Sequence, residues 1–369
     1  MGMNEPSWKV TARTIVLSVL VGGAAGVFAS AMTSDYLSDY ALQLGNLTEP
    51  LRLAEQRPRS VPQSYQEAVK AVRERSTTAV AQFYDPVQNA PANGFVPYDT
   101  FGVSMLGAVL TSDGWIVTRV LPDSGLTAQK IALYAIVVGE KAYTVDQVVP
   151  HPDGVTFFVK VSGQNLPVMA FGSGWEVQAG EQVFVLASRE SILPEWVSSV
   201  EFDGGRVHLD TDLPRELVLS GGEGQRPGAS VVNAAGELVG IVSANAIVQP
   251  IDEILPLFHA FLRDEKIAVP KLGVSVLDLA HAVAVPQTES HGLTAGALIV
   301  QNGVLSRSAA AVAGLVAGDV ILTVDGDSVN ADRTLQEHMI QFTPGDQVTL
   351  GIQRGAQKTD VEVTLGSLE

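Results

Sequence analysis

The chain has 369 residues, of which 46% are hydrophobic and 17% charged, a composition that can bury the cores of two or three domains. Forty acidic residues against 23 basic ones give a net charge of −17, which repels phosphate backbones and argues against nucleic-acid binding. The chain contains no cysteine, which excludes thiol catalysis, disulfides and thiolate metal sites.

The first feature along the chain is an uncharged, apolar stretch over residues 14–34. At about 1.5 Å per residue, a helix of this length crosses a hydrocarbon core about 30 Å thick. Lys9 and Arg13 precede the stretch and acidic residues follow it, so the positive side stays cytoplasmic and the bulk of the chain lies outside. Residues 1–34 are therefore predicted to be a cytoplasmic tip and a single-pass membrane anchor. The Ala-Ser-Ala run at 29–31 offers an alternative, cleavage by signal peptidase.

Four further segments follow in chain order. Residues 35–76 are polar and form a linker, which ends in a short helix that begins at a serine cap. Over residues 77–249, short apolar runs alternate with Gly, Asp and Asn turns, a pattern typical of a sandwich or barrel. Residues 250–268 contain one apolar helical face and predict a bridging helix. Residues 269–369 predict a small β-barrel with two helices.

Taken together, these pieces resemble the HtrA/Deg family of trypsin-like serine proteases with PDZ domains. The fragments that carry the resemblance are, in order, LGAVLTSDGWIVT, HPDGVTFFVKVSGQNLPVMAFGSGWEVQAGEQVFVLAS, ASVVNAAGELVGIVSA, PIDEILPLFHAFLRDEKIAVPKLGVSV, SRSAAAVAGLVAGDVILTVDGDSV and TPGDQVTLGIQRG. The resemblance covers residues 70–369. It implies a mainly β fold, in which a trypsin-like double β-barrel at 77–249 is followed by a PDZ domain at 269–369.

Two catalytic positions of that family are occupied here by hydrocarbon side chains. The family histidine ends a threonine-asparagine-x-histidine pattern; here Thr118 matches the threonine, Arg119 replaces asparagine and Leu121 replaces histidine. The family aspartate precedes a strand that corresponds to TFFVKV, which places Val155 at its position. Because neither leucine nor valine accepts a proton, the base and its orienting carboxylate are both missing.

The position of the nucleophile has two alternatives. Counting back from SVVNAAGELVGI places Pro227 at the serine position, whereas counting forward from LDTD reaches Ser220. With Pro227, the oxyanion hole also loses a donor, because proline has no N–H. With Ser220, a hydroxyl remains that has no base to activate it. Loss of the nucleophile or base of such a triad lowers turnover about 10⁶-fold, so both alternatives predict a pseudoprotease.

The histidines do not offer a replacement base. His151 lies in the turn HPDG and is expected to be a surface turn residue. His208, Asp210 and Asp212 alternate in RVHLDTD and are expected on the solvent face of a barrel strand. A metal site there would lack an evident third ligand, so we expect no metal and no cofactor.

The PDZ part retains its peptide-binding pattern. Lys271-Leu272-Gly273-Val274 matches the family's x-apolar-Gly-apolar loop, whose backbone N–H groups bind a peptide's C-terminal carboxylate while the peptide adds as a strand. On the helix at 331–342, Leu335, Met339 and Phe342 share one face, and they form either domain core or a ligand wall. Leu335 and His338, together with Met339, are the candidate ligand contacts on that wall.

The expected function follows from the resemblance. It implies a membrane-anchored, exported protein in periplasmic or extracellular protein quality control, whose inactive protease domain supports a peptide-binding PDZ domain as scaffold, sensor or regulatory subunit. Expected partners are C-terminal or extended peptides, other copies of the chain (often as trimers) or an active relative. The alternative is an active serine endopeptidase that uses Ser220.

Overall fold

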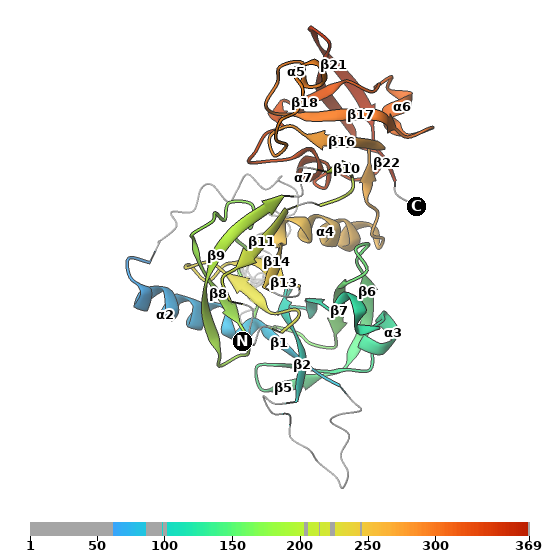
Figure 1. Ribbon diagram of the computed structural model, residues 1–369. Coiled ribbons are helices and arrows are strands. Elements are labelled where there is room, and N and C mark those ends of the chain that lie inside the picture. The colour runs from blue at the N-terminus through green and yellow to red at the C-terminus, as the bar shows by residue number, and fades with distance from the viewer. Residues whose placement is uncertain are drawn as a thin grey trace, which may run out of the picture. The chain divides into compact units, whose positions relative to one another are not determined.

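The computed structural model describes residues 62–85, 98, 102–202, 206–213, 215–221, 226–243 and 246–367 (Figure 1). All of these belong to one compact unit, Arg59–Glu369. The expected anchor at 14–34 and most of the expected linker lie outside the described residues. Among the residues that the structure describes, no helix is both long and apolar enough to cross a membrane.

The first described element is helix α2 (Tyr65–Arg75), which confirms the helix predicted at the end of the linker. The Ser64 side chain accepts a hydrogen bond from the Glu67 backbone N–H at 3.2 Å and so caps the helix start. Ala68 and Val72 of this helix are buried in the larger hydrophobic cluster of the protein. A 3₁₀ turn, η2 (Thr77–Ala79), then leads into the first strand.

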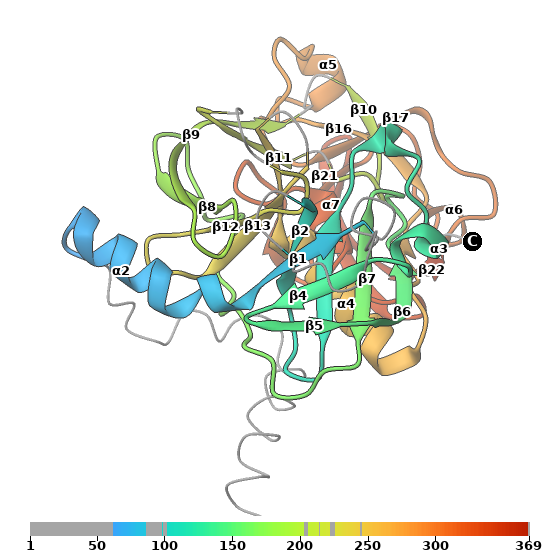
Figure 2. The same cartoon turned by 90° about the horizontal axis from the view of Figure 1, so that it is seen from below.

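The first β unit is a seven-stranded antiparallel sheet in the order β5-β4-β1-β2-β3-β7-β6, seen from below in Figure 2. Two short helical segments, η3 (Pro122–Ser124) and α3 (Ala128–Ile131), connect β3 to β4. The strands are β1 (Val80–Tyr84), β2 (Val103–Val109), β3 (Trp115–Arg119), β4 (Ala135–Val138), β5 (Lys141–Tyr143), β6 (Val145–Pro150) and β7 (Thr156–Val161).

The second β unit is a closed barrel in the order β11-β14-β13-β12-β8-β9. One hydrophobic cluster runs through both units, from Val80 in the sheet to Val231 in the barrel. The barrel strands are β8 (Gln182–Leu186), β9 (Ile192–Phe202), β11 (Arg215–Leu219), β12 (Ser230–Val232), β13 (Leu238–Val242) and β14 (Ile247–Pro250).

The predicted bridging helix is present, but it begins later than expected. A 3₁₀ turn, η4 (Ile251–Glu253), precedes helix α4 (Leu255–Asp264). Phe258 and Phe261 of α4 pack edge-on against Trp115 of β3, with ring centroids 5.8 and 5.2 Å apart. These contacts bury the apolar face of α4 against the first β unit.

The C-terminal unit has the two predicted helices, α6 and α7, and a further short helix, α5, that was not predicted; its strands surround its own hydrophobic cluster. Its main sheet runs β10-β16-β17-β18-β20-β21, with β19 paired to β18 and β15 paired to β22. The elements are β15 (Pro270–Lys271), β16 (Val274–Asp278), α5 (Gln287–Ser290), β17 (Ala297–Val304), α6 (Ala309–Val312), β18 (Val320–Val324), β19 (Asp327–Ser328), α7 (Leu335–Met339), β20 (Gln347–Arg354), β21 (Gln357–Thr364) and β22 (Gly366–Ser367).

The edge strand of this C-terminal sheet corrects one expectation. Strand β10 (Val207–Leu209) lies in the segment RVHLDTD, which the sequence predicts to be part of the double barrel. In the structure β10 pairs with β16 of the C-terminal sheet instead (Figure 1). Alternation of side chains identifies a strand but not its partner, because any sheet edge can accept it.

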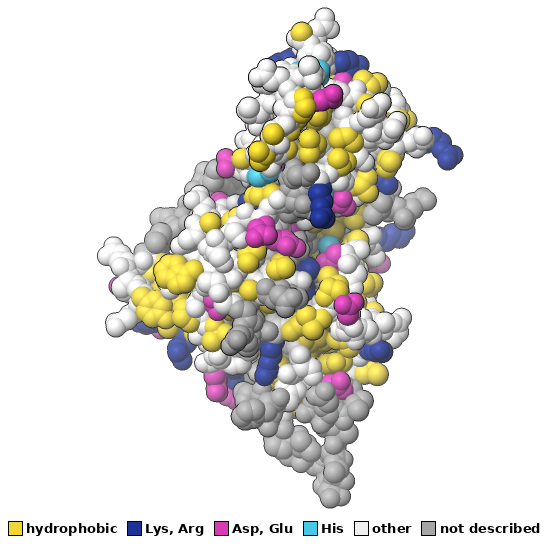
Figure 3. Space-filling model, viewed as in Figure 1, with side chains coloured by type: hydrophobic (Ala, Val, Ile, Leu, Met, Phe, Trp, Pro, Cys, Tyr) yellow, Lys and Arg dark blue, Asp and Glu magenta, His cyan; other side chains and the backbone are white. Residues whose placement is uncertain are grey.

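The surface agrees with the acidic composition. On the face drawn in Figure 3, Lys and Arg side chains of the described residues lie among hydrophobic and acidic ones.

Candidate functional site

The end of strand β3 brings together three residues that the sequence places at candidate catalytic positions, Leu121, Val155 and Pro227. The Thr118 hydroxyl donates to the Leu106 carbonyl at 2.5 Å, and the Leu106 N–H donates to the Pro227 carbonyl at 3.1 Å. The Val120 N–H, next to Leu121, donates to the Val155 carbonyl at 2.9 Å. Pro227, Val155 and Leu121 are therefore all tied to β3 or to its immediate partner strand.

The side chains at these positions offer no acid or base. Leu121 is 43% exposed at the start of η3, Val155 is half-buried, and Pro227 is half-buried beside β2. Gly228, which follows Pro227, has a positive φ of 80° and donates its N–H to the Val242 carbonyl at 3.0 Å. The backbone at Pro227 and Gly228 is thus fixed by hydrogen bonds on both sides.

A buried arginine lies in the same neighbourhood. Arg119 is 5% exposed, and its Nη1 donates to Asp153 Oδ2 at 2.9 Å and to the Thr156 hydroxyl at 2.6 Å. Its Nη2 donates to the Ser243 hydroxyl at 3.4 Å. The sequence marks Arg119 only as a departure from the family pattern; its ion pair depends on a turn more than 30 residues away, at Asp153.

Asp153 is the carboxylate nearest in sequence to Val155, the expected position of the family aspartate, and both of its oxygens accept hydrogen bonds. Besides Arg119, it accepts the Val155 N–H at 3.0 Å, the Thr156 N–H at 2.8 Å and the Thr156 hydroxyl at 2.6 Å. Burial alone would raise the pKa of Asp153, but the positive charge of Arg119 and the hydrogen bond from the Thr156 hydroxyl hold this pKa below its usual range. A carboxylate in this state stays ionised and is a poor proton acceptor.

His151 is buried, which corrects the expectation of a surface turn residue. Its side chain is 6% exposed and lies edge-on to Phe158, with ring centroids 6.2 Å apart. Nδ1 accepts the Asp153 N–H at 3.2 Å, and Nε2 has no hydrogen-bond partner among the described residues. The turn itself was predictable; the burial comes from the packing on β7.

Ser220 extends the pairing between β9 and β11. Its N–H donates to the Trp196 carbonyl at 2.8 Å, and its hydroxyl accepts the Trp196 N–H at 3.1 Å. The hydroxyl donates in turn to Glu195 Oε2 at 2.9 Å. The Ser220 side chain is exposed, and its partners in the described part of the chain are a backbone amide and a carboxylate rather than an imidazole.

The predicted carboxylate-binding loop does hold a carboxylate. Leu272 N–H donates to Asp210 Oδ2 at 2.6 Å, while Gly273 N–H and Val274 N–H donate to Oδ1 at 3.0 and 2.9 Å. Gly273 has a positive φ of 84°, which turns these donors towards one point. Lys271 lies in β15 and pairs with Gly366.

The bound carboxylate belongs to the chain itself, which corrects the expectation that Asp210 faces solvent. Asp210 is 2% exposed, and its backbone N–H donates to the Val274 carbonyl at 3.0 Å. His208, which precedes it on the same strand face, lies 3.9 Å from Asp212 (Nδ1 to Oδ2). Residues 207–210 therefore pair with the edge of the C-terminal sheet and do not form part of the barrel.

Helix α7 places its apolar residues in the domain core. Leu335 and Met339 are each 1% exposed within the C-terminal hydrophobic cluster, and Phe342 packs against that cluster. His338 is 4% exposed, and its Nε2 lies 3.1 Å from the Ser328 carbonyl. Of the two alternatives for this face, these contacts favour domain core. Gln336, which the sequence does not single out, reaches the Leu209 carbonyl at 3.4 Å.

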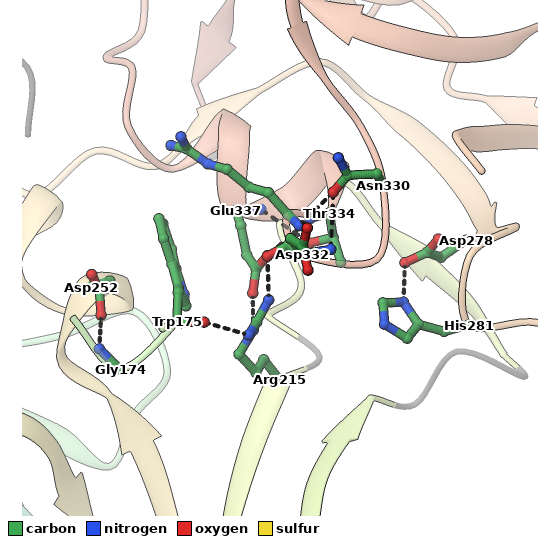
Figure 4. Close-up of polar contacts among 11 residues, drawn as sticks. Gly174, Trp175, Arg215, Asp252, Asp278, His281, Asn330, Asp332, Thr334 and Glu337 are labelled. Carbon is green, nitrogen blue, oxygen red and sulfur yellow. Dashed lines mark hydrogen bonds and ion pairs between the residues drawn. The ribbon is translucent and has the colours of Figure 1, made fainter. Parts of the chain in front are cut away.

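A buried ion pair, which the sequence does not indicate, joins the barrel to α7 (Figure 4). Arg215 Nε and Nη2 bind the two carboxylate oxygens of Glu337, and the two side chains are 4% and 0% exposed. Arg215 also donates to the carbonyls of Trp175 at 3.1 Å and Asp332 at 2.7 Å. Glu337 completes a capping box with Thr334 at the start of α7. That box is a recognisable sequence signal, but it indicates a helix start and not the arginine.

Comparison with known proteins agrees with this architecture. Residues 270–365 match the PDZ domain family. A probable periplasmic serine endoprotease, DegP-like, of Pseudomonas putida strain GB-1 is 26% identical over 284 residues, which cover 71% of this chain and 56% of that protein. The putative serine protease HhoB of Synechocystis is 26% identical over 278 residues, 70% of this chain and 65% of that protein. The chain thus spans little more than half the length of the DegP-like relatives.

Solved structures share the fold. The HtrA-type protease AlgW with a tripeptide has a TM-score of 0.54 and 21% identity, over 83% of this chain and 98% of that one. The same protease with a decapeptide has a TM-score of 0.51 and 20% identity, over 83% and 99%. The fold is therefore that of a trypsin-like protease domain followed by a PDZ domain, as predicted. Together with the matching relatives, this fold supports the resemblance of the chain to the HtrA/Deg family.

Proposed function

We propose that this chain is an exported HtrA/Deg-family protein whose protease domain does not hydrolyse peptides and instead supports a peptide-binding PDZ domain. The observation that carries the proposal is the neighbourhood at the end of β3. There the Val155 carbonyl accepts from Val120, next to Leu121, and the Pro227 carbonyl accepts from Leu106 of the adjoining strand β2. None of these side chains can take a proton from an attacking hydroxyl. The carboxylate beside them, Asp153, is engaged by Arg119.

The location and partners rest on the sequence and on the relatives. The apolar stretch at 14–34 supports a single-pass anchor with the bulk of the chain outside the cytoplasm. The DegP-like relatives are named as periplasmic, which supports a site in the cell envelope. In this setting the protein acts as a scaffold, a sensor or a regulatory subunit of an active relative. Coexpression with such a relative, followed by pull-down, separates the regulatory subunit from a free-standing scaffold.

An active endopeptidase that uses Ser220 is the second candidate, and one observation favours it. The Ser220 hydroxyl is exposed and donates to Glu195 Oε2 at 2.9 Å, so a proton acceptor is within reach. Against it, the hydrogen-bond partners of this hydroxyl among the described residues are the Trp196 N–H and the Glu195 carboxylate, and neither is the imidazole that serves as base in the family's triad.

Labelling with a fluorophosphonate probe, together with casein hydrolysis, tests the proposal. We expect neither labelling nor hydrolysis by the wild-type chain, because loss of a triad base lowers turnover about 10⁶-fold. Ser198→Ala provides a matched control, since Ser198 is an exposed serine on β9, the strand with which Ser220 pairs through Trp196. Labelling that Ser220→Ala abolishes and Ser198→Ala leaves intact would establish the endopeptidase instead.

A further inference from the structure

We propose that residues 207–210 are a built-in ligand of the PDZ groove, so that an external peptide binds only by displacing them. This inference rests on the proposed peptide binding and specifies its ligand and its regulation. The ligand is an extended peptide with a free C-terminal carboxylate, and the regulator is the chain's own strand β10.

The carboxylate of Asp210 fills the place of a peptide terminus. Three successive N–H groups, from Leu272, Gly273 and Val274, bind its two oxygens at 2.6–3.0 Å. Capture of a carboxylate by such a nest of backbone N–H groups is a general mode of recognising a chain terminus. With all three donors engaged by a 2% exposed side chain, a second carboxylate finds no free donor in this loop.

The residues before Asp210 fill the place of the peptide strand. Val207, His208 and Leu209 pair antiparallel with Leu277, Val276 and Ser275 of β16. β10 is the edge strand of the C-terminal sheet and pairs with β16. An external peptide that added as a strand beside β16 would occupy the place that β10 now fills.

The same four residues therefore supply both features by which an added strand is recognised, a terminal carboxylate contact and continuous main-chain pairing. A helix-side contact completes the arrangement. Gln336 of α7 donates its side-chain N–H to the Leu209 carbonyl at 3.4 Å.

Covalent attachment makes this occupant hard to displace. A tethered segment competes at an effective concentration of the order of millimolar, whatever the concentration of protein. The segment continues into β11, where Arg215 forms the buried pair with Glu337 of α7. Displacement of β10 by a peptide would therefore act directly on a strand of the barrel, and this couples occupancy of the groove to the protease domain.

Binding of a fluorescent peptide to the full-length chain in detergent tests the inference. The probe is fluorescein-labelled RVHLV, which repeats residues 206–209 and ends in a free carboxylate; its amidated form is the control. Asp210→Asn removes the charged carboxylate from the loop. Asp212→Asn removes the same charge from a half-exposed side chain of the same segment and keeps an acceptor for the Leu209 N–H.

We expect Asp210→Asn to bind the probe about tenfold more tightly than wild type or more, and Asp212→Asn to match wild type. The amidated peptide should not bind detectably. Equal affinity of wild type and Asp210→Asn would overturn the built-in ligand and leave peptide binding intact. Absence of binding to every variant would overturn both proposals.

A disulfide lock provides a second measurement that does not depend on the stability of Asp210→Asn. The chain has no cysteine, and Leu209 lies opposite Ser275 in the antiparallel ladder, so a Leu209→Cys/Ser275→Cys variant has cysteines at a separation that a disulfide can bridge. We expect the oxidised variant to lose binding of the probe and the reduced variant to regain it. Binding that is equal in the two redox states would show that β10 does not block the groove.

Discussion

The buried pair between Arg215 and Glu337 gives the sharpest quantitative prediction. Replacement of Arg215 by Met removes a guanidinium that makes four hydrogen bonds, two to Glu337 and one each to the carbonyls of Trp175 and Asp332. It leaves Glu337, which is 0% exposed, as a charge without its partner. Removal of one partner of a buried pair costs about 3–5 kcal/mol, and we expect a loss of that size in the free energy of unfolding.

A double-mutant cycle separates the pair from its surroundings. Glu337→Met should cost a similar amount, because it leaves the Arg215 guanidinium buried without its carboxylate. The double variant should lose less than either single one, about 1–2 kcal/mol, since an apolar pair replaces the ion pair and only the carbonyl contacts and the cap at Thr334 are lost.

Urea unfolding of the full-length chain in detergent, followed by tryptophan fluorescence and circular dichroism, measures all four proteins. Additive effects of the two single substitutions, or a loss below about 1 kcal/mol for either of them, would refute the argument that the pair is buried and coupled.

Two further predictions concern the buried carboxyl group of Glu253 and the tightly packed backbone at Gly228. Burial and the neighbouring Glu337 carboxylate raise the pKa of Glu253 well above 4.5, so its stabilising contribution is complete below that value and is lost as the pH rises through the raised pKa. Urea titrations should therefore find Glu253→Gln equal to wild type near pH 4 and more stable than wild type near pH 8; a constant difference would contradict this. Gly228→Ala should cost about 2–4 kcal/mol, because a Cβ there would lie 1.9 Å from the Leu106 carbonyl oxygen at a positive φ. Gly180→Ala, also at positive φ but with nothing within 4 Å, should cost only about 1–2 kcal/mol, and equal thermal shifts for the two would contradict the close approach.

The sequence predicts local features of this protein well. The Ser64 cap, the bridging helix and the shared face of Leu335 and Met339 all follow from spacing, because each depends on neighbours within one or two helical turns. Carboxylate binding by the loop at 271–274 was predicted from its resemblance to the family's x-apolar-Gly-apolar loop, and in the structure its N–H groups bind the carboxylate of Asp210.

Features that depend on distant partners could not be predicted in this way. Asp210 lies 62 residues before Leu272, and Arg215 lies 122 residues before Glu337. Alternation of side chains in RVHLDTD is satisfied equally by the barrel and by the C-terminal sheet, so nothing local selects between them. The burial of His151 also depends on another strand, through Phe158 of β7.

The position of β10 also affects how the protein acquires its structure during synthesis. A ribosome produces the protease domain first, and domains generally fold in that order. Residues 207–210 nevertheless have no partner strand until β16 has been synthesised, more than 60 residues later. The barrel strands, which end at Pro250, are thus all synthesised before the partner of this segment, and a strand that precedes β11 in the chain becomes the edge of the second domain's sheet.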